Sequence, residues 1–230
     1  MIHTVYKLCN LNFRTMHDPN IESSSCHNKT QPAVSTRPRS ELAPVSEKMS
    51  SNDDGHFLYF AFGSNLLKRR LQYNNPSATF YLTGRLKDYK LKFGYWGNDV
   101  SSSWHGGAAT IEYCPGAEIW GVIWTISNRD LLTLDKQEGV SKGMYSPLEV
   151  SVETEHGPKH CRTYQMNNFH AGLPSPQYKK VICLGAEENG LPTEYLNKLY
   201  SIETNGYSGY PMLTEKKRNQ EFMWEKLKTP

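Results

Sequence analysis

The sequence lacks the patterns that mark several large classes of protein. No stretch approaches 18 consecutive apolar residues, so no membrane-spanning helix is predicted. There is no phosphate-binding loop and no glycine-rich dinucleotide fingerprint. The cysteines stand far apart without a Cys-x-x-Cys pair, which argues against a disulfide framework or a zinc ribbon and fits reduced thiols in a cytosolic protein. They are Cys9, Cys26, Cys114, Cys161 and Cys183.

An excess of charge is also missing from the middle of the chain. The 26 basic and 23 acidic side chains leave a formal net charge of +3. Residues 51–200 contain 15 of each, so the excess lies at the two ends. A nucleic-acid-binding domain normally carries a basic stripe. We therefore expect neither a nucleic acid nor a membrane as a partner.

Residues 1–55 are predicted to form a disordered extension, and residues 206–230 a C-terminal tail. The extension is polar and rich in Pro and Ser, so burial cannot offset its ordering entropy. Its first 17 residues contain Lys7 and Arg14 but no acid, which makes mitochondrial import a secondary expectation beside a cytoplasmic location. A single catalytic domain is expected over residues 56–205.

Short apolar runs between turn residues dominate that domain, and helical periodicity is rare. Because strands and helices do not alternate regularly, we expect the α+β class, with a mixed β-barrel or sheet and a few short helices. The predicted strands are 57–62, 79–83, 86–93, 107–112, 118–125, 148–152 and 161–166, and the predicted helices are 66–71, 127–138, 178–188 and 192–202. Ser64 and Asn65 are expected to cap the first helix, Ser127 and Asp130 to form a capping box, and Ser175-Pro176 to start the third helix.

The first candidate site is the segment from Tyr59 to Leu66. A buried strand meets Gly63 and then a helix start, whose free backbone N–H groups carry partial positive charge. Such groups can hold a carboxylate or stabilise an oxyanion. Turns of this kind are common in proteins as purely structural features, so the segment alone does not show whether it is a functional site.

The second candidate is Glu138, which precedes Gly139 at the end of a predicted helix. The C-terminus of a helix is itself negative, so an acid there should have a raised pKa. A raised pKa suits proton transfer near neutral pH. A surface glutamate is the competing interpretation.

Five segments, taken together, closely resemble the gamma-glutamylcyclotransferase family. They are Phe57–Leu66, Asn75-Pro76-Ser77, Trp104-His105-Gly106-Gly107, Leu134–Val140 and Pro174–Lys180. The resemblance covers about residues 57–205. It implies that family's fold and an enzyme, a lyase formerly classed as an acyltransferase, that acts in glutathione metabolism. The implied reaction converts a gamma-glutamyl-amino acid into 5-oxoproline and a free amino acid, without a metal or cofactor, and the implied assembly is a homodimer.

The resemblance also implies roles for particular residues. The family's acid/base glutamate falls on Glu138, and its later substrate-contacting tyrosine falls on Tyr178. Its substrate loop falls on Tyr59, Phe60, Ala61, Phe62, Gly63, Ser64 and Asn65. The family's motif has a tyrosine where this chain has Phe62, so one hydroxyl is missing. If that hydroxyl bonds the substrate, its loss costs about 0.5–1.5 kcal/mol of binding.

Other functions stay open at this stage. The enzyme could be specific for glutathione or for gamma-glutamylamines, or the fold could serve as a non-catalytic binding module. His105 could orient another group or be structural. His156 and His160 are four residues apart, but Gly157-Pro158 between them forbids a helix, so no metal pair is expected.

Overall fold

The computed structural model describes residues 55–97 and 102–209, and predictions made for residues 1–54 and 210–230 lie outside this part of the chain. The strands are β1 (His56–Ala61), β2 (Thr79–Trp96), β3 (Ala108–Ser127), β4 (Tyr145–Val152), β5 (Lys159–Met166) and β6 (Phe169–Ala171). The α-helices are α1 (Lys68–Gln72), α2 (Leu131–Gln137), α3 (Pro176–Glu188) and α4 (Thr193–Tyr200). Among these residues, no helix has the length and apolar character needed to cross a bilayer.

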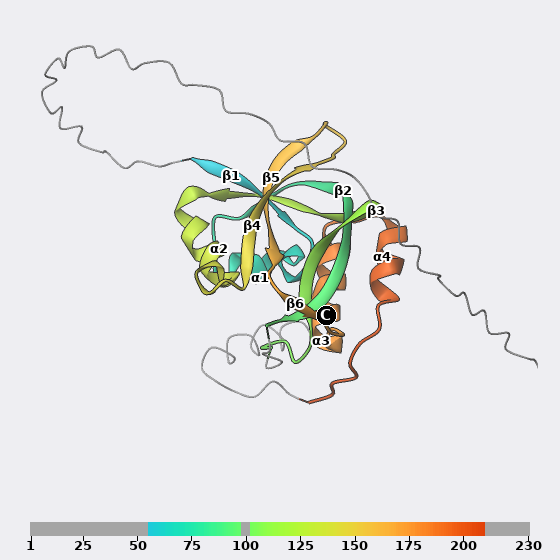
Figure 1. Ribbon diagram of the computed structural model, residues 1–230. Coiled ribbons are helices and arrows are strands. Elements are labelled where there is room, and N and C mark those ends of the chain that lie inside the picture. Colours follow the sequence, from blue (N-terminus) through green and yellow to red (C-terminus); the bar gives the residue numbers. More distant parts are fainter. Residues whose placement is uncertain (1–54, 98–101, 210–230) are drawn as a thin grey trace, which may run out of the picture. The chain divides into compact units, whose positions relative to one another are not determined.

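The six strands form one mixed sheet in the order β4-β5-β1-β3-β2-β6. Strands β1 and β5 run parallel, and the other neighbours run antiparallel. The sheet curls into a half-barrel in which β2 and β3 are the long members (Figure 1). The predicted α+β class with a mixed sheet and short helices is confirmed.

Two pairs of predicted strands are single long strands, which corrects the prediction. Strand β2 spans both 79–83 and 86–93. Strand β3 starts one residue later than predicted, at Ala108, and includes the rest of 107–112 and all of 118–125. Gly84 does not end a strand; a Cβ there would lie 2.6 Å from Val152 Cγ1, so the glycine permits close packing. Between Lys87 and Tyr89 the register shifts, and the Asp88 carboxylate accepts a hydrogen bond from Gly116 N at 2.8 Å. A bulge therefore lies opposite the predicted break at 113–117, and the pairing runs without interruption through the predicted break at 84–85.

Helix starts follow the prediction at Ser175 and only partly at Ser127. Ser175 Oγ accepts from Tyr178 N at 3.1 Å, and Pro176 occupies the first turn. Ser127 Oγ accepts from Arg129 N, but the predicted capping box with Asp130 is wrong. The Asp130 carboxylate instead accepts from the Ser77 hydroxyl at 2.6 Å, which fastens the Asn75-Pro76-Ser77 turn to the start of α2.

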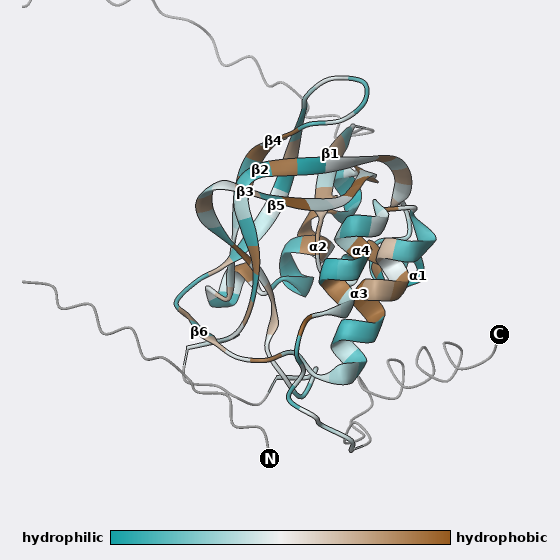
Figure 2. Ribbon diagram, turned by 90° about the vertical axis from the view of Figure 1, so that its right-hand side faces the viewer, coloured by the Kyte–Doolittle hydropathy of each residue, from teal (hydrophilic) through white to brown (hydrophobic). Residues whose placement is uncertain are grey.

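The core lies between the sheet and the helices α1, α3 and α4, which gather on one side of it (Figure 2). Trp124, Phe60 and Ile123 are fully buried there. Gly185 of α3 packs so closely on the turn after β1 that a Cβ would lie 2.4 Å from Leu67 N. The core thus holds the turn after β1 and the C-terminal half of α3 in fixed positions.

We predict that Gly121→Ala destabilises the fold by about 1–3 kcal/mol. A Cβ at Gly121 would lie 2.3 Å from the Ala61 carbonyl oxygen and 2.7 Å from the Phe60 ring, both parts of the rigid β1. Urea unfolding measures the effect. Leu132→Ala truncates a side chain that is 80% exposed, so this control should change stability by less than about 0.5 kcal/mol. An unchanged midpoint for Gly121→Ala would contradict the packing argument.

Candidate functional site

A cavity opens where the end of β1, the end of α2 and the start of α3 meet. It has an outer chamber of about 240 Å³ and a smaller inner recess of about 40 Å³. Four residues line both parts: Ser64, Glu138, Tyr145 and Tyr178. The inner recess is closed by the loop after β1, through Tyr59, Phe62, Gly63 and Asn65, together with Ala109 and Tyr164. The cavity therefore joins the two candidate segments of the sequence.

Glu138 lies at the junction of the two chambers, at the C-terminal end of α2 as predicted. The residue is half-buried because one edge lines the cavity, while its carboxylate is enclosed by protein groups. This burial raises the pKa of Glu138. The nearby charge of Arg70 and hydrogen bonds from Asn65 and Gln137 oppose the shift without reversing it. A carboxyl group with a raised pKa at a cavity wall can both accept and return a proton.

Asn65 holds the Glu138 carboxylate in place. Its Nδ2 donates to Glu138 Oε1 at 3.0 Å and to the Tyr59 hydroxyl at 2.9 Å. Its Oδ1 accepts from Gln137 Nε2 at 3.0 Å. The expected helix cap by Ser64 and Asn65 is wrong, because a 3-10 turn over Ser64–Leu66 precedes α1 and neither start has a side-chain cap. The buried side-chain amide of Asn65 instead forms hydrogen bonds with groups at the cavity.

Tyrosine hydroxyls and one backbone segment build the opposite wall. The Tyr178 hydroxyl accepts from Ala109 N at 3.0 Å and is hydrogen-bonded to Ser64. The Tyr145 hydroxyl donates to the Ala109 carbonyl at 2.9 Å. Burial raises the pKa of Tyr178, Tyr145 and Tyr59, so all three hydroxyls stay protonated at neutral pH. They can donate or accept hydrogen bonds without adding charge.

Several cavity residues were missed by the sequence analysis. Arg70 and Trp104 line the outer chamber, and Tyr145 lines both chambers. Tyr164 donates to Asp135 Oδ1 at 2.5 Å, and Arg162 pairs with the same carboxylate at 2.8 Å. No local pattern marks Arg70, Tyr145 or Tyr164, since their partners are distant in the chain, whereas Trp104 lies in one of the five family segments. The spacing within the Trp104 motif was the one available signal.

Some predicted residues lie away from the cavity. Phe60 and Ala61 are buried in the core, and neither is among the residues that line the chambers. The His105 ring stacks on Tyr207 at 4.4 Å, and its carbonyl accepts from Asn205, which is a structural arrangement. His156 and His160 are exposed. Among the described residues, no group of three or more His, Cys, Asp or Glu is arranged to hold a metal ion.

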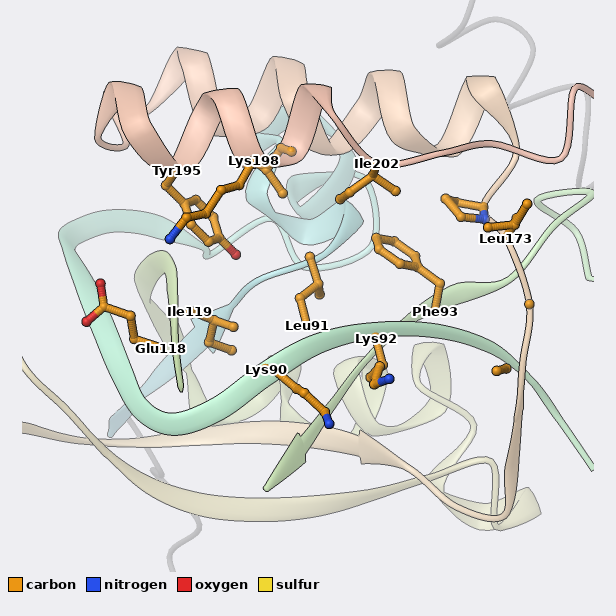
Figure 3. Close-up of a pocket in the computed structure, with 14 residues that line it drawn as sticks. Lys90, Leu91, Lys92, Phe93, Glu118, Ile119, Leu173, Tyr195, Lys198 and Ile202 are labelled. Atoms are coloured by element: carbon orange, nitrogen blue, oxygen red, sulfur yellow. The ribbon is translucent and has the colours of Figure 1, made fainter. Parts of the chain in front are cut away.

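A larger hollow of about 580 Å³ lies elsewhere, between β2 and α4 (Figure 3). Leu91 and Phe93 point into it from the sheet, and Ile202 faces them from the other side. Lys90 and Lys92 extend their amino groups away from this apolar centre, and both pair with Glu112. Size alone therefore does not mark the reactive site. The carboxylate that lines this hollow, Glu118, is 38% exposed and forms an ion pair with Arg85.

Comparison with known proteins agrees with the fold. Residues 118–199 match the AIG2-like family. A solved structure of a gamma-glutamyl cyclotransferase superposes with a TM-score of 0.68 at 49% identity, covering 74% of this chain and 99% of that one. The curled mixed sheet with its carboxylate-bearing cavity thus defines an enzyme of the cyclotransferase class.

Two curated relatives give the family. The chain is 56% identical to the Bos taurus gamma-glutamylcyclotransferase over 164 residues, which is 71% of this chain and 87% of the bovine protein. It is 53% identical to the Homo sapiens gamma-glutamylcyclotransferase over 158 residues, or 68% and 84% of the two chains. The chain belongs to the gamma-glutamylcyclotransferase family.

Proposed function

We propose that this enzyme converts gamma-glutamyl-amino acids into 5-oxoproline and a free amino acid. The observation that carries the proposal is the Glu138 carboxylate, whose pKa burial raises and whose position at the junction of the chambers Asn65 maintains. The names of the bovine and human relatives support the gamma-glutamyl part of the substrate.

The proposed reaction forms one bond and breaks one. The nitrogen of the substrate's α-amine attacks its own γ-carbonyl carbon and closes a five-membered ring. The C–N bond to the amino acid then breaks, and that nitrogen leaves as an amine. Glu138 takes a proton from the attacking nitrogen and returns it to the leaving nitrogen, so no water and no net proton is consumed.

The inner recess suits the glutamyl part of the substrate. In the 3-10 turn, Leu66 N and Leu67 N are bonded to the carbonyls of Gly63 and Ser64. The N–H groups that precede them, at Gly63, Ser64 and Asn65, begin the turn and have no partner within it. They are proposed to stabilise the oxyanion that forms at the γ-carbonyl. The protonated Tyr145 and Tyr178 hydroxyls orient the chain for ring closure, which supplies much of the remaining acceleration.

Phe62 keeps the apolar part of the family's tyrosine. Its ring is buried, lies 6.4 Å from the Phe60 ring and borders the inner recess. The role of Phe60, Ala61 and Phe62 is therefore proposed to be the support of the loop, with Gly63, Ser64 and Asn65 in contact with substrate.

Purified enzyme should release 5-oxoproline from gamma-glutamyl-alanine and little or none from glutathione. The reason is the match of the Glu138 and Tyr178 segments to the family that acts on gamma-glutamyl-amino acids. Chromatographic measurement of 5-oxoproline with each substrate tests the prediction. Comparable kcat/KM values on both would refute the substrate assignment, and turnover of glutathione alone would favour the glutathione-specific alternative.

Domain organisation, location and assembly are also proposed from the sequence and the family. We propose that residues 56–205 form the catalytic domain, flanked by the two predicted tails. We further propose a cytoplasmic location, a homodimeric assembly and a role in glutathione metabolism, on the strength of the family membership and the reduced-thiol pattern of the sequence.

A further inference from the structure

Arg70 is a charged side chain in the cavity that the proposed reaction does not use. It extends from α1 into the outer chamber, which Glu138 and Tyr178 also line. The carbon of its guanidinium group lies 5.8 Å from the centre of the Trp104 ring. Trp104 in turn packs on the Tyr178 ring at 4.7 Å. The guanidinium therefore has a fixed position beside the reacting groups.

The guanidinium of Arg70 lacks a carboxylate partner among the described residues. Its Nε is buried and has no hydrogen-bond partner among the described residues. Glu138 and Tyr178 attract its charge, yet no carboxylate in this part of the chain lies within ion-pair distance of it. A guanidinium whose Nε is buried without a partner carries a desolvation cost that a carboxylate ligand would offset. A cavity that preserves such a group is ready to bind an anion.

The position of Arg70 selects which carboxylate of the substrate it can meet. A gamma-glutamyl-amino acid has one carboxylate on the glutamyl part and another on the leaving amino acid. Arg70 lines the outer chamber but not the inner recess that suits the glutamyl part. Besides small and polar residues such as Ser102 and Ser103, the outer chamber has further aromatic and thioether side chains, which can pack on the side chain of an amino acid. They are Tyr95, Trp96, Trp104, Met144 and Met166.

We propose that Arg70 binds the carboxylate of the leaving amino acid and so selects gamma-glutamyl-amino acids over gamma-glutamylamines. The inference rests on the proposed function, because it places the glutamyl part in the inner recess. It also gives a reason for discrimination against glutathione. In that molecule the carboxyl of the residue joined to the γ-carbonyl is a neutral amide, and the next carboxylate lies one residue farther along.

Paired substrates test the proposal. Gamma-glutamyl-alanine and gamma-glutamyl-ethylamide differ in the leaving group by one carboxylate. Arg70→Gln should lower kcat/KM for gamma-glutamyl-alanine roughly ten- to hundredfold, the usual effect of losing a hydrogen bond to a charged group. Loss of the Arg70 charge also raises the pKa of Glu138, so each enzyme is measured at its own pH optimum. There the same variant should change kcat/KM for gamma-glutamyl-ethylamide less than threefold. Arg70→Lys keeps the positive charge but loses the planar guanidinium, which can donate two parallel hydrogen bonds to a carboxylate. Its kcat/KM for gamma-glutamyl-alanine should lie between those of Arg70→Gln and the wild type.

The controls separate this inference from the proposed function. Lys68→Gln removes the same charge from the exposed side of the same helix and should leave both substrates unaffected. Equal losses on the two substrates, or no loss on either, would overturn the role of Arg70 while leaving the cyclotransferase reaction intact. A wild-type enzyme inactive on gamma-glutamyl-alanine would overturn the proposed function and this inference together. If Arg70→Gln fails to fold, the comparison is made with Arg70→Lys, and equal wild-type efficiency on the two substrates also refutes the inference.

Discussion

Glu138→Gln should lower kcat for gamma-glutamyl-alanine by at least about 100-fold, with a range of about 10²–10⁴ typical for a positioned acid/base group. The glutamine keeps the shape of the side chain and an oxygen that can accept from Asn65, but it cannot take the proton of the attacking amine. Binding of 5-oxoproline, measured by calorimetry, should persist because the loop after β1 and Tyr178 are unchanged. Residual activity above about a tenth of wild-type kcat would remove Glu138 from the proton-transfer role.

The same variant should be at least as stable as the wild type at neutral pH. Burial raises the folded-state pKa of Glu138 above its unfolded value, so the charged carboxylate costs folding free energy. That cost appears as pH rises through the raised pKa and vanishes at pH values below both pKa values. Urea unfolding at pH 8 and pH 4 measures the difference in unfolding free energy between Glu138→Gln and the wild type. This difference should be smaller at pH 4.

Glu155→Gln is the matched control for both measurements. Its side chain is 78% exposed in the turn between β4 and β5, and it is not among the residues that line the cavity. It should keep the wild-type rate and stability. A comparable loss in Glu155→Gln would mean that the rate responds to net charge rather than to the position of the Glu138 carboxylate.

Asn65→Leu should reduce kcat at pH 7 by at least about tenfold, because it removes a hydrogen bond to a charged group. The leucine has a similar volume, but it leaves the Tyr59 hydroxyl, Glu138 Oε1 and Gln137 Nε2 without the bonds that Asn65 provides. The bond from Asn65 lowers the pKa of Glu138, so its loss should raise that pKa further. The pH at which the rate rises should therefore move to a higher value.

A full pH–rate profile of Asn65→Leu distinguishes this role from simple loss of structure. Destabilisation alone would lower the amplitude without moving the profile, and a profile in the wild-type position would contradict the role assigned to Asn65. Asn65→Ala provides a second variant with less steric demand and the same expected direction. Asn197→Leu changes an exposed asparagine of α4 and should leave the rate and the profile unchanged.

Local signals in the sequence were enough to place the turn after β1, the end of α2 and the start of α3. Gly139 ends α2 in the left-handed conformation that glycine permits, and Ser175 caps α3 with its own side chain. Each of these signals acts over a few residues, so it can be recognised before the chain has folded. The mixed α+β class also follows from the pattern of apolar runs. These features, with the spacing of the five family segments, were sufficient to select Glu138, the loop after β1 and Tyr178 as candidates.

Only the tertiary structure decided what those candidates touch. Asn65, expected as a helix cap, bonds Glu138, which is 73 residues away. Asp130, expected in a capping box, bonds Ser77, and Arg70 meets Trp104 across the cavity. A polar side chain of this kind has several local partners of similar free energy, and burial in the folded chain selects among them. Each of the long strands β2 and β3 replaces two predicted short strands for a related reason. Pairing of β2 with β3 along their length satisfies backbone groups that breaks at the local turn signals would leave unpaired.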